Sequence, residues 1–240
     1  MLDILLLPIR FLMWMPRRLI RVGLHVWCGL RHGQPFAWSR GARPLGPHYG
    51  MWWLELMLLL VDLAGLPEWY EIGNRLFKWK TRRLSPEELK TGKEVYGDSI
   101  PWFWLRLDSW ARLGTRRLKI AYVSFCTINF WEKLVPSVFV HELDHVWQFH
   151  QWGSVYILRA LVAQRTVEGY NYGGFENLKS AQLAGLSLFD FNYEQQADII
   201  ADRWRISHGA KPVWNSGEPN LEVYDYFLKD LQRDKEQDVV

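Results

Sequence analysis

The sequence is poor in cysteine, which excludes two common ways of holding a small fold together. Its 240 residues include two cysteines, Cys28 and Cys126, which lie far apart in the chain. Two cysteines at this distance form neither a disulfide framework nor a cysteine-type zinc site. A reducing compartment is therefore the default expectation.

Signals for crossing a membrane are also missing. The apolar stretch 4–15 has no basic residue ahead of it and no small-residue cleavage site after it, so we recognise no cleavable signal peptide. The other long apolar run, residues 51–66, contains Glu55 and Asp62. These acids offset the gain from inserting the apolar residues, and their spacing of seven puts them on one helical face. We expect an amphipathic helix that is interfacial or packs against the first segment.

Aromatic residues and arginines, by contrast, are abundant and unevenly placed. Fifteen tryptophans exceed what a core of this size needs and suggest an interface with lipid or another protein. Residues 1–48 carry seven arginines and one acid, although the net charge of the chain is only +3. The charge is therefore concentrated at the N-terminal end.

Residues 1–30 predict one or two basic amphipathic helices with a break near Pro16. Arg10, Arg17 and Arg21 fall on one side of a helical wheel. This pattern favours a helix in a membrane interface, with arginines toward anionic headgroups. A basic helix docked on a partner protein, or a core helix with a solvated arginine edge, is the alternative. We expect no nucleic-acid binding, because no base-reading motif accompanies the arginines.

We divide the chain near residue 80, into an N-terminal helical extension (1–80) and a catalytic domain (81–240). The extension is expected to meet a membrane surface or a membrane-complex partner through residues 1–66, as a peripheral protein on the cytoplasmic side. Residues 31–50 are rich in Gly and Pro and predict a loop. The contact residues expected are Arg10, Arg17, Arg21, Trp52 and Trp53.

The second part of the chain predicts an α+β fold that is mostly helical with a small antiparallel sheet. Ser85, Pro86 and Glu88 form a helix-start pattern, with Ser85 as the N-cap. Partly alternating segments 102–110 and 117–126 predict an antiparallel pair of strands. Further helices are expected over residues 138–148, with an end at Trp152-Gly153, and over 156–167, 193–204 and 221–235, with a loop over 169–175.

The sequence His-Glu-Leu-Asp-His at 141–145 is the most specific motif in the chain. On a helix, residues four apart point the same way, so His141 and His145 can each offer a nitrogen to one Zn²⁺. Glu142 lies one step round the helix, where it can reach a water on the metal and act as general base. The flanking Val140, Leu143 and Trp147 lie on the opposite face and suit a core.

A catalytic zinc ion usually takes a third protein ligand. Glu194 is the best candidate, because it lies on a predicted helix with Asp198 four residues later on the same face. Asp198 could then accept the second ring N–H of a ligating histidine. His150 is rotated away from the metal face. The other downstream candidates are Glu168, Glu176 and His208.

At this point the chain resembles a known group. His-Glu-Leu-Asp-His-Val-Trp-Gln at 141–148, Asn-Tyr-Glu-Gln-Gln-Ala-Asp at 192–198 and Gly-Asp-Ser-Ile at 97–100 are similar to the zincin-like metallopeptidase domains of bacteria that are often associated with contractile injection systems. The resemblance covers roughly residues 82–206. It implies a gluzincin-type site with His141, His145 and Glu194 as ligands and Glu142 as catalyst. Asp144 departs from the small or hydroxyl residue common there.

The leading expectation is therefore a zinc-dependent metallopeptidase acting on a peptide or protein substrate. A donor for the developing oxyanion is also needed, and Tyr170, Tyr172 or Tyr193 could provide it. The alternative is a non-catalytic, membrane-associated structural or accessory subunit that retains a zincin-like fold. A toxin-like effector that acts on membranes through its N-terminus is a third hypothesis.

Overall fold

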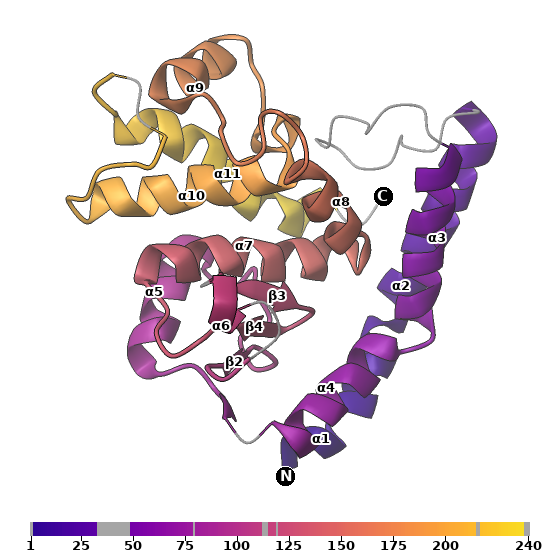
Figure 1. Ribbon diagram of the computed structural model, residues 1–240. Coiled ribbons are helices and arrows are strands. Elements are labelled where there is room, and N and C mark those ends of the chain that lie inside the picture. Colours follow the sequence, from indigo (N-terminus) through magenta and orange to yellow (C-terminus); the bar gives the residue numbers. More distant parts are fainter. Residues whose placement is uncertain are drawn as a thin grey trace.

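The computed structural model describes residues 2–32, 49–78, 80–111, 115–118, 120–214 and 217–237. A long N-terminal helical hairpin runs along one side of the molecule, and a mostly helical domain with a small sheet lies on the other (Figure 1). The mostly helical fold with a small sheet agrees with the sequence-based prediction. No helix among the described residues combines the length and the apolar character that crossing a bilayer requires.

The N-terminal hairpin consists of one long helix packed against two shorter ones. A single turn, α1 (Leu2–Leu5), precedes the long helix α2 (Leu7–His32). Helix α2 packs against α3 (Tyr49–Leu63) and α4 (Leu66–Phe77). Most of the loop expected over residues 31–50 lies outside the described residues.

The break expected near Pro16 is wrong, because α2 continues through this residue. A proline inside a helix removes one backbone hydrogen bond and tends to kink the helix. Here the helix is held on both sides of the proline, since Arg10 and Arg18 both donate to the carboxylate of Glu68 on α4, at 3.0 Å and 2.8 Å. One buried acid therefore keeps the two halves of α2 in line.

The acids of α3 point into the protein. Glu55 forms a buried ion pair with Arg159 of α8 (Val155–Ala163), with 2.7 Å between the carboxylate and Nε. Asp62 accepts hydrogen bonds from the backbone N–H and the hydroxyl of Ser154. The two acids share a helical face, as predicted, but this face contacts the domain. Residues 51–66 are therefore anchored to the rest of the chain by their charged side.

The hairpin also contacts the sheet. Glu71 of α4 accepts a hydrogen bond from the backbone N–H of Cys126 at 3.0 Å, and Lys78 lies 3.0 Å from the carboxylate of Asp108. The boundary expected near residue 80 falls between α4 and the first strand. Polar contacts nevertheless join the residues on its two sides.

Four short strands form the sheet, in the order β1-β2-β4-β3. The strands are β1 (Thr81–Arg82), β2 (Arg106–Asp108), β3 (Tyr122–Ser124) and β4 (Thr127–Asn129). β4 pairs in parallel with β2 and antiparallel with β3. The antiparallel pairing expected between segments 102–110 and 117–126 is therefore wrong, because β4 lies between β2 and β3 and the sheet is mixed. The chain reaches β4 from β2 by a crossover that includes the short helix α6 (Thr115–Leu118), which is the kind of connection a parallel pair requires.

Helix α7 (Pro136–Trp152) lies at the centre of the domain and packs against α10 (Tyr193–Ser207). Its residues Val140, Leu143 and Trp147 are fully buried, as the sequence predicts. The start of helix α5 (Pro86–Tyr96) is also as predicted, with Ser85 and Glu88 forming a reciprocal capping box. The remaining elements are α9 (Gly174–Leu183), the 3₁₀ helix η1 (Leu188–Asp190) and α11 (Leu221–Gln237).

The buried pair between Glu55 and Arg159 makes a testable contribution to stability. The Glu55→Gln substitution leaves the Arg159 guanidinium buried without its counter-charge, which is expected to lower the free energy of unfolding by about 3–5 kcal/mol. Urea denaturation of the purified protein measures this change. The double substitution Glu55→Leu/Arg159→Met should be less destabilised than the single one, because no buried charge is left unpaired. A loss of under about 1 kcal/mol, as expected for Met57→Gln on the exposed face, would contradict the assignment.

His150 predicts a pH dependence of the contact between the hairpin and α7. Burial, together with Arg17 and Arg21, lowers the pKa of His150 to about 3. The unfolded chain therefore binds a proton that the folded chain does not, and stability falls as pH drops below the ordinary histidine value of about 6.5. Between pH 7.5 and 5.5, the free energy of unfolding should fall by about 1 kcal/mol more in the wild type than in His150→Gln. Identical pH dependence of the two proteins would show that His150 does not titrate in this way.

Candidate metal centre

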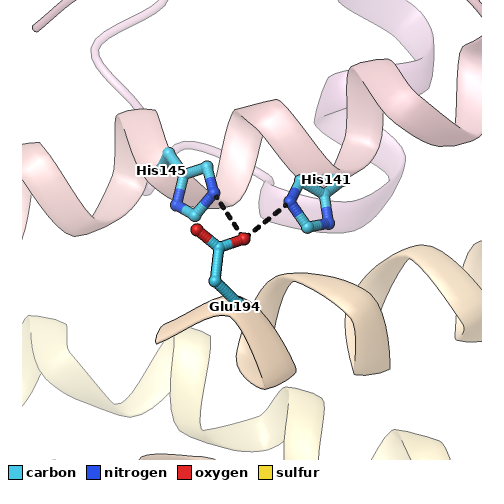
Figure 2. A group of neighbouring side chains, drawn as sticks. All are labelled: His141, His145 and Glu194. Atoms are coloured by element: carbon cyan, nitrogen blue, oxygen red, sulfur yellow. Dashed lines mark ion pairs between the residues drawn. The ribbon is translucent and has the colours of Figure 1, made fainter. Parts of the chain in front are cut away.

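The two motif histidines and Glu194 meet between α7 and α10 (Figure 2). His141 and His145 project from one face of α7, and Glu194 projects toward them from the first turn of α10. The Nε2 atoms of the histidines lie 3.3 Å and 3.4 Å from the same oxygen, Oε2 of Glu194. One potential ligand atom from each residue lies within 4.8 Å of the others. The cluster could therefore hold a metal ion.

The two distances to Glu194 fit the spacing of ligand atoms around a tetrahedral metal ion. With ligand bonds of about 2.0–2.1 Å, neighbouring ligand atoms of a tetrahedron lie about 3.3–3.4 Å apart. Both distances to Glu194 fall in this range. In addition, Oε2 of Glu194 is buried and accepts no hydrogen bond from the described residues. A buried carboxylate oxygen that faces two imidazole nitrogens is the donor that a divalent cation requires.

The ring of His141 is oriented by Asp198, one turn along α10 from Glu194. Nδ1 of His141 lies 2.8 Å from Oδ1 of Asp198, and a carboxylate can only accept, so Nδ1 carries the proton. The lone pair on Nε2 is then directed at Glu194. Asp198 is itself held by a hydrogen bond of 2.6 Å from the indole N–H of Trp214.

The ring of His145 is oriented by the amide of Gln148. Its Nδ1 lies 2.8 Å from Oε1 of Gln148. The amide can only be in this orientation, because its NH₂ group lies 2.7 Å from the carboxylate of Asp144 and 3.0 Å from the backbone carbonyl of Tyr193. Nδ1 of His145 is therefore the donor, and Nε2 keeps its lone pair. Asp144, the unusual residue of the motif, acts on the site through Gln148.

The pKa of each residue in the cluster depends on the charges of the other residues. Burial opposes ionisation of Glu194, but the two histidines outweigh this effect and lower its pKa. Burial likewise opposes the charge on His145, yet the nearby Glu194 raises its pKa to about 9. The pKa of His141 is raised well above its usual value, against the effect of burial, by the nearby carboxylates of Asp198 and Glu194. A metal ion must replace these protons, so its apparent affinity should increase with pH.

Glu142 is placed beside the cluster without a partner of its own. Its side chain is buried, and its Oε2 accepts no hydrogen bond from the described residues. Burial raises the pKa of Glu142, while the charges of His141 and His145 lower it. A carboxylate with a spare oxygen next to potential metal ligands is suited to accept a proton from water.

Only one of the three tyrosines considered as oxyanion donors lies near the cluster. The ring of Tyr170 is 5.9 Å from that of His141 between centroids, and its side chain is partly exposed. The hydroxyl of Tyr172 contacts Asp202, and that of Tyr193 accepts from Arg159, which leaves Tyr170 as the tyrosine beside the cluster.

The other candidate ligands lie outside the cluster. His150 contacts Arg17 on the hairpin, with 3.5 Å between the ring and the guanidinium. Glu168, Glu176 and His208 are exposed. Within the described part of the chain, His141, His145 and Glu194 form the one group of three metal-binding side chains.

The residues expected to contact a membrane are divided between surface and interior. Trp53 and Arg17 are exposed, and Trp52 is half-buried against a histidine of α2. Arg10 is fully buried, and Arg21 donates to a backbone carbonyl of α7 at 2.6 Å. The expectation that Arg10 faces lipid headgroups is wrong, because its charge is used inside the protein.

Three supporting residues were missed in the sequence. Gln148 lies three residues after His145 on the buried side of α7, so a polar residue at this helical spacing was an available signal. Gln164, which donates to Oε1 of Glu194 at 2.8 Å, and Trp214 are brought to the site by loops. No local pattern marks these two.

Comparison of the sequence with protein-family models and with curated proteins, and of the structure with solved structures, finds no match. The functional argument therefore depends on the geometry of the site itself.

Metal affinity should depend on the residue that orients His141. Replacing Asp198 with Ala removes the acceptor of the Nδ1 proton and is expected to weaken zinc binding about 10–100-fold. Competition with a chromogenic chelator measures the dissociation constant. Asp225→Ala is the matched control, since Asp225 lies on α11 and pairs with Arg203 of α10, outside the cluster. Equal affinities of the two variants would show that Asp198 does not support the site.

Proposed function

We propose that this chain is a zinc-dependent metallopeptidase in which His141, His145 and Glu194 bind the metal and Glu142 is the general base. The observation that carries the proposal is the convergence of two oriented imidazole nitrogens on one buried carboxylate oxygen, at the spacing of a tetrahedral site. Three protein ligands leave a fourth position for water, as in catalytic zinc sites.

The chemistry of each group in the site gives it a separate role in hydrolysis. When bound, Zn²⁺ supplies Lewis-acid chemistry, which lowers the pKa of a water toward about 7 and polarises a carbonyl. Glu142 takes the proton of the attacking water and passes it to the leaving nitrogen. Its buried, unpaired oxygen supports this role. Tyr170 is the candidate donor to the developing oxyanion, because its ring lies beside that of His141.

An extended peptide is the favoured substrate class. Strand β3 is at one end of the sheet order and packs against α7, the helix that carries the histidines. A sheet edge can pair with an extended peptide through main-chain hydrogen bonds, which would bring the peptide alongside the motif helix.

A non-catalytic, membrane-associated subunit is the alternative. The apolar exposed side of the N-terminal hairpin favours membrane association, but this feature is compatible with activity or with its absence. The effect of replacing Glu142 distinguishes the two functions, because a purely structural subunit does not need a general base.

Hydrolysis of a peptide library by the wild type and by Glu142→Gln, at equal zinc content, tests the proposal. The variant should bind zinc normally and lose about 10²–10⁴-fold in rate, because the proton acceptor is removed while the metal ligands remain. Glu176→Gln, which alters an exposed glutamate outside the cluster, should retain the wild-type rate. Equal rates for Glu142→Gln and the wild type would contradict the catalytic assignment.

A further inference from the structure

The N-terminal hairpin exposes apolar side chains and buries charged ones, which is the reverse of an ordinary surface element. Eighteen of the twenty-eight large hydrophobic side chains that are exposed in the described chain lie on α1–α4. Soluble surfaces rarely carry an apolar patch of this extent, and such patches mark interaction sites. The exposed large hydrophobic residues are Leu5, Ile9, Leu12, Met13, Leu19, Ile20, Leu24, Trp27, Leu30, Trp53, Leu54, Met57, Leu60, Leu66, Trp69, Tyr70, Leu76 and Phe77.

On α2 these residues form one continuous face. Positions 9, 12, 13, 19, 20, 24 and 27 fall within a sector of about 140° on a helical wheel. The opposite side of α2 carries Arg10 and Arg18, which are buried. The third helix repeats this arrangement, with Trp53, Met57 and Leu60 exposed and the acid between them, Glu55, buried.

The charges of the hairpin are used internally. Glu55 pairs with Arg159, and Glu68 with both buried arginines of α2. Among residues 4–30 and 51–77, Arg17 is the one charged side chain in the exposed class. Tyr70 carries the one exposed side-chain hydroxyl or amide in the same ranges. The outward face thus offers almost no hydrogen-bonding groups.

We propose that the outward face of the N-terminal hairpin, formed by the exposed residues of α1–α4, lies in one leaflet of a lipid bilayer with its helices parallel to the membrane plane. Amphipathic helices bind membranes in this way, with the apolar face buried at the boundary between headgroups and acyl chains. The domain that contains the metal cluster, on the inner side of the hairpin, then lies above the membrane surface (Figure 1).

A bilayer fits this face better than a protein partner does. Protein interfaces have a polar rim and about one hydrogen bond per 100–200 Å² of buried area, and this face could form very few. Its exposed Trp27, Trp53 and Trp69 are of the type that is enriched at the level of the headgroups. Because Arg10 and Arg18 pair with Glu68 inside the protein, their attraction to anionic lipids should contribute little. Binding is therefore driven by apolar burial, and a zwitterionic membrane is sufficient.

Flotation of the full chain with extruded vesicles tests the proposal. The vesicles are phosphatidylcholine alone, or phosphatidylcholine with one quarter phosphatidylglycerol, each at about 0.15 M and 1 M salt, where exposed charges are weakly and strongly screened. The wild type should float in all four conditions. Leu12→Glu/Ile20→Glu should reduce the partition coefficient about tenfold or more, since it places two charges in the apolar face.

The matched control is Val167→Glu/Leu183→Glu, which adds the same charges at exposed apolar positions outside the hairpin and should float like the wild type. Equal flotation of the two double variants would overturn the proposal. So would flotation that needs anionic lipid and disappears at high salt, because binding would then depend on charge. A lipid-free dimer that Leu12→Glu/Ile20→Glu converts to a monomer, without flotation of the wild type, would assign the face to a second copy.

A second readout does not depend on introducing charges. Vesicles of brominated phosphatidylcholine should quench part of the tryptophan emission of the wild type, and Trp27→Phe/Trp53→Phe/Trp69→Phe should remove most of the quenched part. Trp110→Phe, at an exposed position of the domain, should leave it unchanged. Quenching that persists in the hairpin variant would contradict the proposal. Zinc content and peptide hydrolysis are not used in either test, so the result is independent of the proposed activity.

Discussion

The packing of α7 against α10 is the contact on which the metal cluster depends. His141 and His145 come from one helix and Glu194 from the other, so a small shift between the helices would separate the three atoms. Gln148 holds the helices in place, because its amide accepts from His145 and donates to the backbone of Tyr193, next to Glu194. Gln148 therefore orients the ring of His145 and also fixes the distance between α7 and α10. Such shared support is typical of metal sites, whose ligands need partners of their own.

The N-terminal hairpin is joined to this centre through α8. Arg159 bonds with Glu55 of the hairpin and with the hydroxyl of Tyr193, and the following loop contributes Gln164 to Glu194. A buried arginine that loses its acid leaves an unpaired charge, which is costly in a low-dielectric interior. The hairpin is therefore part of the support of the domain as well as a surface. Its polarity, with charges inside and apolar side chains outside, follows from having the domain on one side and, as we propose, lipid on the other.

Sequence patterns gave correct predictions where all the residues of the pattern lie on one helix. The spacing of the two histidines placed them on one face of α7, and the capping pattern at Ser85 marked where α5 begins. Signals that depend on pairing between segments were less reliable. The two predicted segments contain β2 and β3, but β1 and β4 were not predicted, and the expected pairing was wrong because β4 lies between β2 and β3. The periodicity of a short strand indicates which side is buried and does not indicate which strand lies beside it.

The sequence by itself determined the mostly helical fold, the orientation of His141 and His145, and the choice of Glu194 as the residue to examine. Each depends on periodicity within a few helical turns. Only the tertiary structure decided which oxygen the imidazoles face, that Gln148 and Trp214 support the site, and that Arg10 and Arg18 of α2 are turned inward. The physical reason is that a helical wheel separates a charged side from an apolar side. It does not show which of the two faces the protein, because that depends on the charges and surfaces brought by distant segments.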